Sequence, residues 1–253
     1  MKKRADEIHD EVLFRPPPKK EECPICLLRL PSLNEGSSYY SCCGKIVCNG
    51  CHCAPVYDDL GNTVDEIKCP FCRTPAAASD EECMERMKKR AELGDAEAIY
   101  SFGVYYCKGL FGFPQNNVKA LELCHRAAEL GHAAAYFNIG CAYANGTGVE
   151  RDMKKAKQYY KLAAVRGYAD ARQNLALREE AEGNMNRALK HWIYAVEGGC
   201  SESLKGIRRL FKNGHATKDE YAKALRSYQA YLDEIRSDER DKAAAFDDRY
   251  KYY

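Results

Sequence analysis

The sequence lacks any long apolar run. Its 253 residues contain no stretch that approaches the roughly 20 apolar residues a helix needs to cross a bilayer. Its first residues, MKKRADEIHDEVLF, also lack the apolar stretch of about 7–15 residues found in secretory signal peptides. We therefore expect a protein without a membrane partner that resides in the cytoplasm, the nucleus or both.

An excess of one charge is also missing. Thirty-nine lysines and arginines face thirty-seven aspartates and glutamates, for a net charge of +2. Residues 1–78, which hold most of the cysteines, contain ten basic and eleven acidic side chains and no basic stripe. Binding to nucleic acid depends on neutralising phosphates with lysine and arginine, so we expect no nucleic-acid partner.

Cysteine, by contrast, is abundant, and its distribution is uneven. Nine of the fourteen cysteines lie between Cys23 and Cys72. A reducing compartment disfavours disulfides, so this cluster is more typical of a metal site than of a disulfide framework. The other five occur singly in helical sequence, where we expect buried core thiols: Cys83, Cys107, Cys124, Cys141 and Cys200.

Three Cys-x-x-Cys pairs provide metal-ligand spacing: Cys23 with Cys26, Cys48 with Cys51, and Cys69 with Cys72. Such a pair places two thiolates within about 4 Å of each other, which is near the edge of a tetrahedron around zinc with Zn–S bonds of about 2.3 Å. Three pairs supply six ligands, whereas two tetrahedral sites need eight. Cys42 and Cys43 are the nearest candidates for the other two, and His52 or Cys53 could replace one of them.

The order of these ligands resembles a RING finger over residues 22–75, ECPIC...SCCGKIVCNGC...CPFCRTP. The resemblance implies two Zn2+ ions and interleaved sites, in which the first and third ligand pairs hold one ion and the second and fourth hold the other. Transferred to this sequence, site one is Cys23, Cys26, Cys48 and Cys51. Site two is Cys42, Cys43, Cys69 and Cys72.

The sequence departs from the common RING pattern after Cys43. Many RING fingers carry histidine where this chain has Lys45, and an ammonium group cannot bind zinc. We favour the all-cysteine version of the family, which requires the adjacent pair Cys42 and Cys43 to fold into a turn at Gly44.

RING ubiquitin ligases dock a charged conjugating enzyme on an apolar surface, and this resemblance implies contact roles for three residues. Ile25 stands inside the first pair, Pro70 inside the last, and Arg73 directly follows the last cysteine. An arginine there would hydrogen-bond both the conjugating enzyme and ubiquitin and restrain the thioester. No residue is expected to act as a covalent catalyst, because closed four-ligand sites leave no open position. The alternative is a purely structural zinc module.

After Thr74 the sequence changes to helix-forming residues, and an internal repeat appears. Ser79 to Glu82 reads as a capping box that opens a helix to about Leu93. The phrases AELGDAEAIYSFGVYYCKG and AELGHAAAYFNIGCAYANG then follow one another. Marker glycines at the helix-to-helix turns lie 37, 36 and 32 residues apart: Gly94, Gly131, Gly167 and Gly199. A small residue nine positions after each of the first three should let paired helices approach closely: Gly103, Gly140 and Ala176.

These repeats resemble Sel1-like repeats, relatives of the tetratricopeptide repeat, closely over about residues 90–200 and less closely over 200–236. The resemblance implies a solenoid of helix pairs whose groove binds a protein or peptide client. Its pairing with a RING-type finger is similar to that of uncharacterised protist RING/Sel1 proteins.

The predicted fold is therefore mainly α, a small two-zinc RING-type module followed by an α-solenoid of Sel1-like helix pairs. We expect a polar N-terminal tail with a proline-rich spacer at 1–20, the zinc finger at 21–75, the capped repeats at 76–236 and a polar tail at 237–253. The predicted function is an E3 ubiquitin-protein ligase that recruits a charged conjugating enzyme with its ubiquitin and a protein client. The alternative is a non-enzymatic zinc-binding interaction scaffold.

Overall fold

The structure is a computed structural model that describes residues 8–18, 20–31, 36–54 and 68–252. It divides into two compact units. We call residues 1–18 and 99–231 the repeat unit, and residues 19–98 and 232–253 the cysteine unit. No helix in the described ranges is both long and apolar enough to cross a membrane.

Helices dominate the described residues, as the sequence predicts, and one two-stranded sheet accompanies them. In chain order the elements are α2 (Asp10–Leu13), β1 (Ser37–Tyr40), β2 (Lys45–Cys48), α3 (Asn49–Cys53), α4 (Asp80–Glu92), α5 (Ala96–Lys108), α6 (Asn117–Glu129), α7 (Ala133–Asn145), α8 (Met153–Val165), α9 (Ala169–Ala181), α10 (Met185–Glu197), α11 (Glu202–Lys212), α12 (Lys218–Ile235), α13 (Asp238–Phe246) and the 3-10 turn η1 (Asp248–Tyr250).

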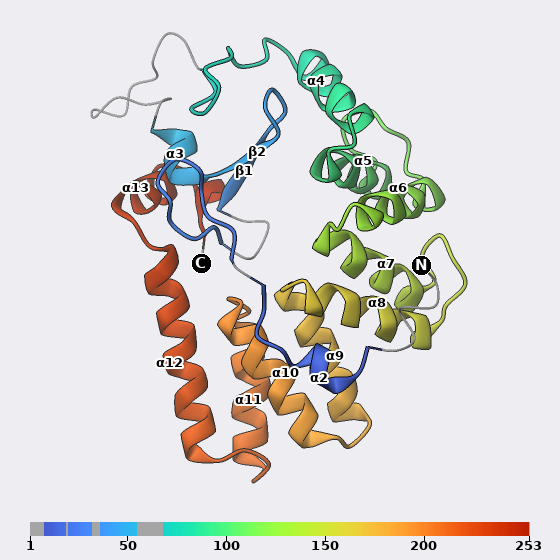
Figure 1. The fold of residues 1–253 in the computed structure, drawn as a ribbon, viewed down its shortest axis with the longest axis vertical. Coiled ribbons are helices and arrows are strands. Elements are labelled where there is room, and N and C mark those ends of the chain that lie inside the picture. The colour runs from blue at the N-terminus through green and yellow to red at the C-terminus, as the bar shows by residue number, and fades with distance from the viewer. Residues whose placement is uncertain (1–7, 19, 32–35, 55–67, 253) are drawn as a thin grey trace. The chain divides into compact units, whose positions relative to one another are not determined.

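The repeat unit is a stack of helices in which successive elements pack against one another from α6 to α11 (Figure 1). The predicted solenoid of helix pairs is thus confirmed. All four marker glycines have left-handed backbone, with φ between +81° and +95°: Gly94, Gly131, Gly167 and Gly199. Glycine adopts this conformation without strain, so each one ends its helix and turns the chain into the next.

Small residues bring the paired helices close together, also as predicted. A Cβ on Gly103 would lie 3.3 Å from Cys124 Sγ in α6, and one on Gly140 would lie 2.7 Å from the ring of Tyr160 in α8. Ala176 belongs to the core cluster around the fully buried Trp192 of α10. Close approach therefore excludes water from the interfaces between helices.

The cysteine unit is built around a β-hairpin and two packed helices. Strands β1 and β2 pair antiparallel, with Tyr40 opposite Lys45 at the turn. Among the described residues, its core cluster consists of Leu30, Val47 and three buried cysteines, with Tyr40 and Ile46 packed against them. Ser79 caps α4 by accepting a hydrogen bond from the Glu82 backbone, as the capping box predicts. So small an apolar core needs additional stabilisation, such as a metal ion.

Two segments that we expected to be polar tails contain buried residues. Leu13 is fully buried in the repeat unit, where α2 packs against α8. In the cysteine unit α13 packs against α3, and both Arg240 and Tyr252 are buried. A few apolar or long side chains anchor each of these otherwise polar segments, which average hydropathy along the sequence does not reveal.

Candidate metal centres

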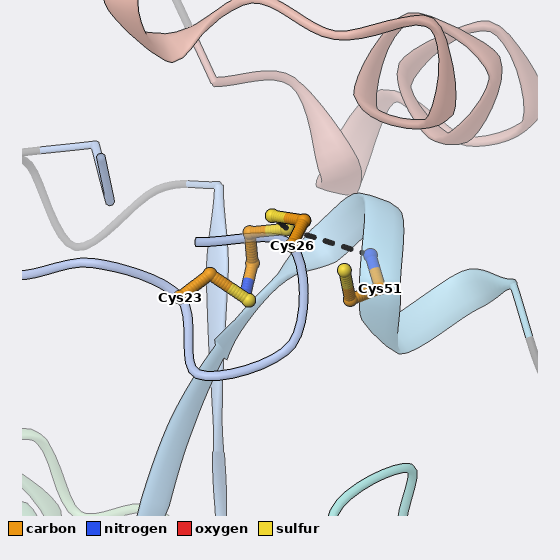
Figure 2. A group of neighbouring side chains, drawn as sticks. Cys23, Cys26 and Cys51 are labelled. Carbon is orange, nitrogen blue, oxygen red and sulfur yellow. Dashed lines mark hydrogen bonds between the residues drawn. The ribbon is translucent and has the colours of Figure 1, made fainter. Parts of the chain in front are cut away.

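Eight cysteines of the cysteine unit gather into two groups of four. Within each group all sulfur atoms lie within 4.8 Å of one another. The first group is Cys23, Cys26, Cys48 and Cys51, and the second is Cys42, Cys43, Cys69 and Cys72. The structure thus brings together the two sets of ligands expected from the sequence. Figure 2 shows Cys23, Cys26 and Cys51 turned toward one another from a loop and from α3.

The spacing of the sulfurs fits a tetrahedral metal site. A Zn–S bond of about 2.3 Å gives a sulfur-to-sulfur edge of about 3.8 Å. Cys26 and Cys48 are 3.7 Å apart, and Cys43 and Cys69 are 3.8 Å apart. A disulfide would hold its sulfurs near 2.05 Å, and all fourteen cysteines are free thiols. Two closed four-sulfur sites suit a soft or borderline cation such as zinc.

Two loops of the same construction supply the first and last cysteine pairs. The Cys23 amide donates to Leu28 oxygen at 2.8 Å, and the Leu27 amide donates to Cys23 oxygen at 2.9 Å. The last pair repeats both bonds, because the Cys69 amide donates to Thr74 and the Arg73 amide donates to Cys69. The turn is so tight that the residue after each second cysteine has left-handed backbone, with φ of 61° at both Leu27 and Arg73.

The hairpin turn supplies the adjacent cysteines of the second group. The amides of Cys43 and Gly44 both donate to Tyr40 oxygen, at 3.2 and 2.8 Å. Gly44 has a φ of +71°, which glycine adopts without strain. Within this turn Cys42 lies 3.4 Å from Cys72, sulfur to sulfur. The turn expected at Gly44 therefore directs both neighbouring thiols into one group.

Crowding shifts the pKa of several thiols in these groups. The contact with the Cys48 side chain lowers the pKa of Cys23 to about 4 and raises the pKa of Cys48. Burial raises the pKa of Cys51 to about 12. In the second group, the Thr74 hydroxyl 3.1 Å away lowers the pKa of Cys72 to about 6. Four clustered thiols cannot all ionise unless a cation balances their charge.

Backbone amides and one arginine supply positive charge to the first group. The Cys48 amide donates to Cys23 Sγ at 3.5 Å, and the Cys51 amide donates to Cys48 Sγ at 3.4 Å. Arg240 of α13 is fully buried, with Nη2 4.0 Å from Cys26 Sγ. Burial opposes its charge, but the Cys48 and Cys26 sulfurs raise the pKa of Arg240 overall. Arg240 could not be predicted from the sequence, because its place within a polar C-terminal segment gives no signal of this role.

The three residues with expected contact roles lie on the two cysteine loops. Ile25 is 40% exposed, and Arg73 is exposed as well, whereas Pro70 is half-buried. Lys45, which stands where many RING fingers have histidine, places its Nζ 5.4 Å from the ring centroid of Phe71. Lys45 therefore contacts an aromatic ring rather than a metal ligand group.

His52 and Cys53 lie outside both groups of four. The Nδ1 atom of His52 is 2.6 Å from the hydroxyl of Tyr40, and its ring centroid is 5.8 Å from that of Tyr250. Burial lowers the pKa of His52 and raises that of Cys53. These two residues contribute to packing in α3.

The five single cysteines do not all behave as expected. Cys124 and Cys200 are buried, and Cys83 and Cys141 are partly buried. Cys107 is exposed at the end of α5, so the expectation of a buried thiol is wrong there. Cys107 lies in the last turn of α5, where its side chain faces solvent.

Comparison with known proteins identifies relatives of the helical repeats. Residues 96–132 and 133–168 match the family model described as Sel1 repeat. The fold is similar to the Sel1 repeat protein of Oxalobacter formigenes, with a TM-score of 0.54 and 27% identity over 61% of this chain and 65% of that one.

Two curated plant proteins share a shorter stretch with this chain. The E3 ubiquitin-protein ligase GW2 of Oryza sativa subsp. indica is 36% identical over 71 residues, which is 28% of this chain and 15% of GW2. The E3 ubiquitin-protein ligase DA2 of Arabidopsis thaliana is 42% identical over 55 residues, 22% of this chain and 12% of DA2. The chain thus spans a small part of the length of these relatives.

Proposed function

We propose that this protein is a zinc-binding RING-type E3 ubiquitin-protein ligase that recruits a charged conjugating enzyme through its cysteine unit and a protein client through its Sel1 repeats. The observation that carries the proposal is the interleaving of the two four-sulfur groups. The first group combines the first and third ligand pairs in chain order, and the second combines the other two. This is the order that the RING resemblance implies.

The eight cysteines would hold two Zn2+ ions, which stabilise loops that otherwise share a minimal core. Partial similarity to GW2 and DA2 supports the ligase activity, since both are named as E3 ubiquitin ligases. The exposed side chains on the two cysteine loops support a contact surface: Ile25, Leu27 and Phe71 are apolar and exposed.

In the proposed reaction the amine of a client lysine attacks the thioester carbonyl between ubiquitin and the conjugating enzyme. An isopeptide bond forms, and the cysteine thiolate of the conjugating enzyme leaves. This chain orients the partners and forms no covalent intermediate. Arg73 would donate hydrogen bonds to both the conjugating enzyme and ubiquitin, which restrains the flexible thioester near the attacking amine.

Discharge of ubiquitin from a panel of charged conjugating enzymes onto free lysine tests this function. The zinc-loaded wild type should accelerate discharge with at least one enzyme. Arg73→Ala should lower that rate about ten- to hundredfold, as expected for lost hydrogen bonds to a charged group. Ile25→Ala should weaken it by removing apolar contact. Arg226→Ala, which changes an exposed arginine of α12, is the matched control and should keep the full rate.

The same assay tests the alternative function. A non-enzymatic zinc-binding scaffold is supported by the Sel1 repeats, whose helix pairs bind proteins without performing chemistry. If the zinc-loaded wild type accelerates discharge with none of the enzymes, the scaffold replaces the ligase.

A further inference from the structure

A segment near the N-terminus lies on α8 of the second repeat and on the two helices of the third repeat, α9 and α10. Leu13 is fully buried, although α2 is only four residues long and begins with two acidic residues. The ring of Phe14 lies 4.8 Å from the ring of His191, centroid to centroid. The hydroxyl of Tyr194 donates to the Phe14 carbonyl oxygen at 2.7 Å. The Phe14 ring and the hydrogen bond to its carbonyl oxygen thus hold this segment on α10, while α2 with Leu13 packs against α8.

Contacts on either side of these two apolar residues extend the occupied surface. Upstream, Asp10 forms an ion pair with Arg187 of α10. Downstream, Pro18 lies beside the turn that joins α8 to α9, where a Cβ on Gly167 would come within 3.4 Å of its ring. Residues 10–18 therefore follow one continuous surface of the repeat unit, as a bound peptide does.

The charge of this surface complements the segment. Three cations surround the ring of Phe14 at 5.6 to 5.9 Å from its centroid: Arg172, Arg187 and Lys190. A cationic surface with an aromatic contact favours a segment that combines a carboxylate with apolar side chains.

The third repeat differs from the first two at the residue that binds Asp10. In the first repeat Lys119 lies 4.4 Å from the ring centroid of Tyr106, and in the second Lys155 lies 5.2 Å from that of Tyr143. The spacing of the repeats places Glu179 and Arg187 at the equivalent positions of the third: 143 + 36 = 179 and 155 + 32 = 187.

This exchange gives Arg187 two separate partners. Its Nε atom is 3.1 Å from the carboxylate of the buried Glu179, and its Nη1 atom binds Asp10. Glu179 therefore fixes the orientation of the guanidinium and leaves one edge of it for a second carboxylate. The equivalent lysines of the other two repeats, Lys119 and Lys155, lie over an aromatic ring and have no guanidinium group that could bind two carboxylates.

We propose that the surface of α8, α9 and α10 occupied by residues 10–18 is the client-binding site of the repeats. Its ligand is a linear segment with an acidic residue followed three and four positions later by leucine and phenylalanine. The chain's own Asp10, Leu13 and Phe14 present that pattern in cis and compete with the client. The inference rests on the proposed function only in naming the client; it needs no ubiquitin transfer.

The competition follows from the small size of the contact. Two apolar side chains, one ion pair and one hydrogen bond from Tyr194 hold the segment, and the side chain of Asp10 remains 58% exposed. A tethered segment has a high effective concentration, so it occupies the site most of the time and lowers the apparent affinity for an external segment. Weakening the tethered copy should therefore open the site.

Fluorescence anisotropy with a labelled synthetic peptide, IHDEVLFRPPP (residues 8–18), tests the proposal on full-length protein. The double variant Leu13→Ala/Phe14→Ala should bind the peptide at least about tenfold more tightly than the wild type, because the tethered segment no longer fills the site. A peptide that carries the same two alanines should not bind. Circular dichroism should show that the variant keeps its helices.

A charge exchange identifies the site. Adding Arg187→Glu to the double variant should abolish binding of the peptide, and a peptide with Asp10→Arg should restore it. Arg208→Glu, which changes an exposed arginine of α11, is the matched control and should leave binding intact.

Three results would overturn the proposal. The first is a folded double variant that binds the peptide no better than the wild type does. The second is binding that Arg187→Glu leaves unchanged. The third is loss of helical structure in the double variant, which would make residues 10–18 a fixed part of the fold. None of these results bears on discharge onto free lysine, so the proposed ligase function stands or fails separately.

Discussion

The Nη2 atom of Arg240 lies 4.0 Å from the sulfur of Cys26, although 214 positions separate the two residues in the sequence. The Nη1 atom of the same arginine donates to the carbonyl oxygens of Arg29 and Ile235, at 2.9 and 2.5 Å. Arg240 therefore joins α13 and the end of α12 to the loop that carries the first cysteine pair. Its charge would also partly balance a zinc ion bound by four thiolates, which carries a net charge of −2.

Arg240→Met should destabilise the cysteine unit. Methionine fills a similar volume but donates no hydrogen bonds, so two buried carbonyl groups lose a charged partner. We expect the free energy of unfolding to fall by about 3 kcal/mol. Urea unfolding of the zinc-loaded chain, together with the rate of zinc transfer to a chromogenic chelator, measures the effect.

Arg236→Met is the control for this substitution. The Arg236 side chain is 73% exposed and forms an ion pair with Asp241 at 3.2 Å. Exposed pairs contribute little, so the change in stability should stay within about 0.5 kcal/mol. Equal effects of the two substitutions would show that Arg240 has no special role beside Cys26.

Serine substitutions should separate metal ligands from other cysteines. Cys26→Ser and Cys72→Ser should each lower the zinc content of the purified chain from two ions to one, because each group of four loses a ligand. Cys53→Ser should keep both ions, since Cys53 lies outside the groups. Mass spectrometry of the metal content measures all three. Loss of an ion from Cys53→Ser would instead assign this residue to the second site.

Two glycine substitutions should show how tightly the helices pack in the repeat unit. A Cβ on Gly206 would lie 2.4 Å from the ring of Trp192, which is fully buried and cannot yield. Overpacking costs about 1–3 kcal/mol, which exceeds the gain in helix propensity of up to about 1 kcal/mol. Gly206→Ala should therefore lower the thermal midpoint of the repeat unit.

Gly103→Ala provides the comparison. Its Cβ would lie 3.3 Å from Cys124 Sγ and from the Ala120 carbonyl oxygen, so a small shift accommodates it. We expect a change within about 0.5 kcal/mol. If both variants melt like the wild type when followed by circular dichroism at 222 nm (a standard helix wavelength), the close packing at Trp192 is not rigid.

Acid should destabilise the repeat unit through His191. Burial, followed by the positive charges of Arg172 and Arg187, lowers the pKa of His191 to about 3. An unfolded chain binds this proton below about pH 6.5. Between these two values the unfolded state holds the extra proton, so stability falls as the pH falls, by up to about 1.4 kcal/mol per pH unit.

His191→Gln should remove this part of the acid sensitivity. Glutamine stays neutral, so its free energy of unfolding should fall less steeply than that of the wild type as the pH drops below about 6.5. Urea unfolding at several pH values measures the two slopes. Proton-driven changes in the cysteine unit are common to both chains, so identical slopes would contradict a neutral, buried His191.

The repeats and the Cys-x-x-Cys pairs could be predicted from local patterns, whereas the assignment of the pairs to two interleaved groups came from the resemblance to RING fingers. A marker glycine such as Gly131 ends a helix in each repeat, because glycine adopts the left-handed backbone of that turn without strain. The period of these glycines then predicts the helix pairs. Cys-x-x-Cys spacing brings two sulfurs together for the same local reason. Patterns of this kind depend on residues that are close in sequence.

Arg240 and Leu13 could not be predicted in this way. Each lies in a short polar segment and acquires its role from residues far along the chain, the cysteine loop for Arg240 and α8 for the segment of Leu13. One buried side chain in a polar segment produces no periodic pattern of apolar residues from which its burial could be predicted. Long-range contacts of single residues need the folded structure.

The division of the cysteine unit between residues 19–98 and 232–253 also bears on its synthesis. The last cysteine of the groups, Cys72, leaves the ribosome 166 residues before α13 begins at Asp238 (238 − 72 = 166). At about 5–20 residues per second this interval lasts roughly 10–30 s. The repeat helices are made in that time, while the cysteine loops have neither Arg240 nor the cover of α13. During this interval the nascent cysteine loops lack the hydrogen bonds that Arg240 donates to the carbonyl oxygens of Arg29 and Ile235 in the folded chain.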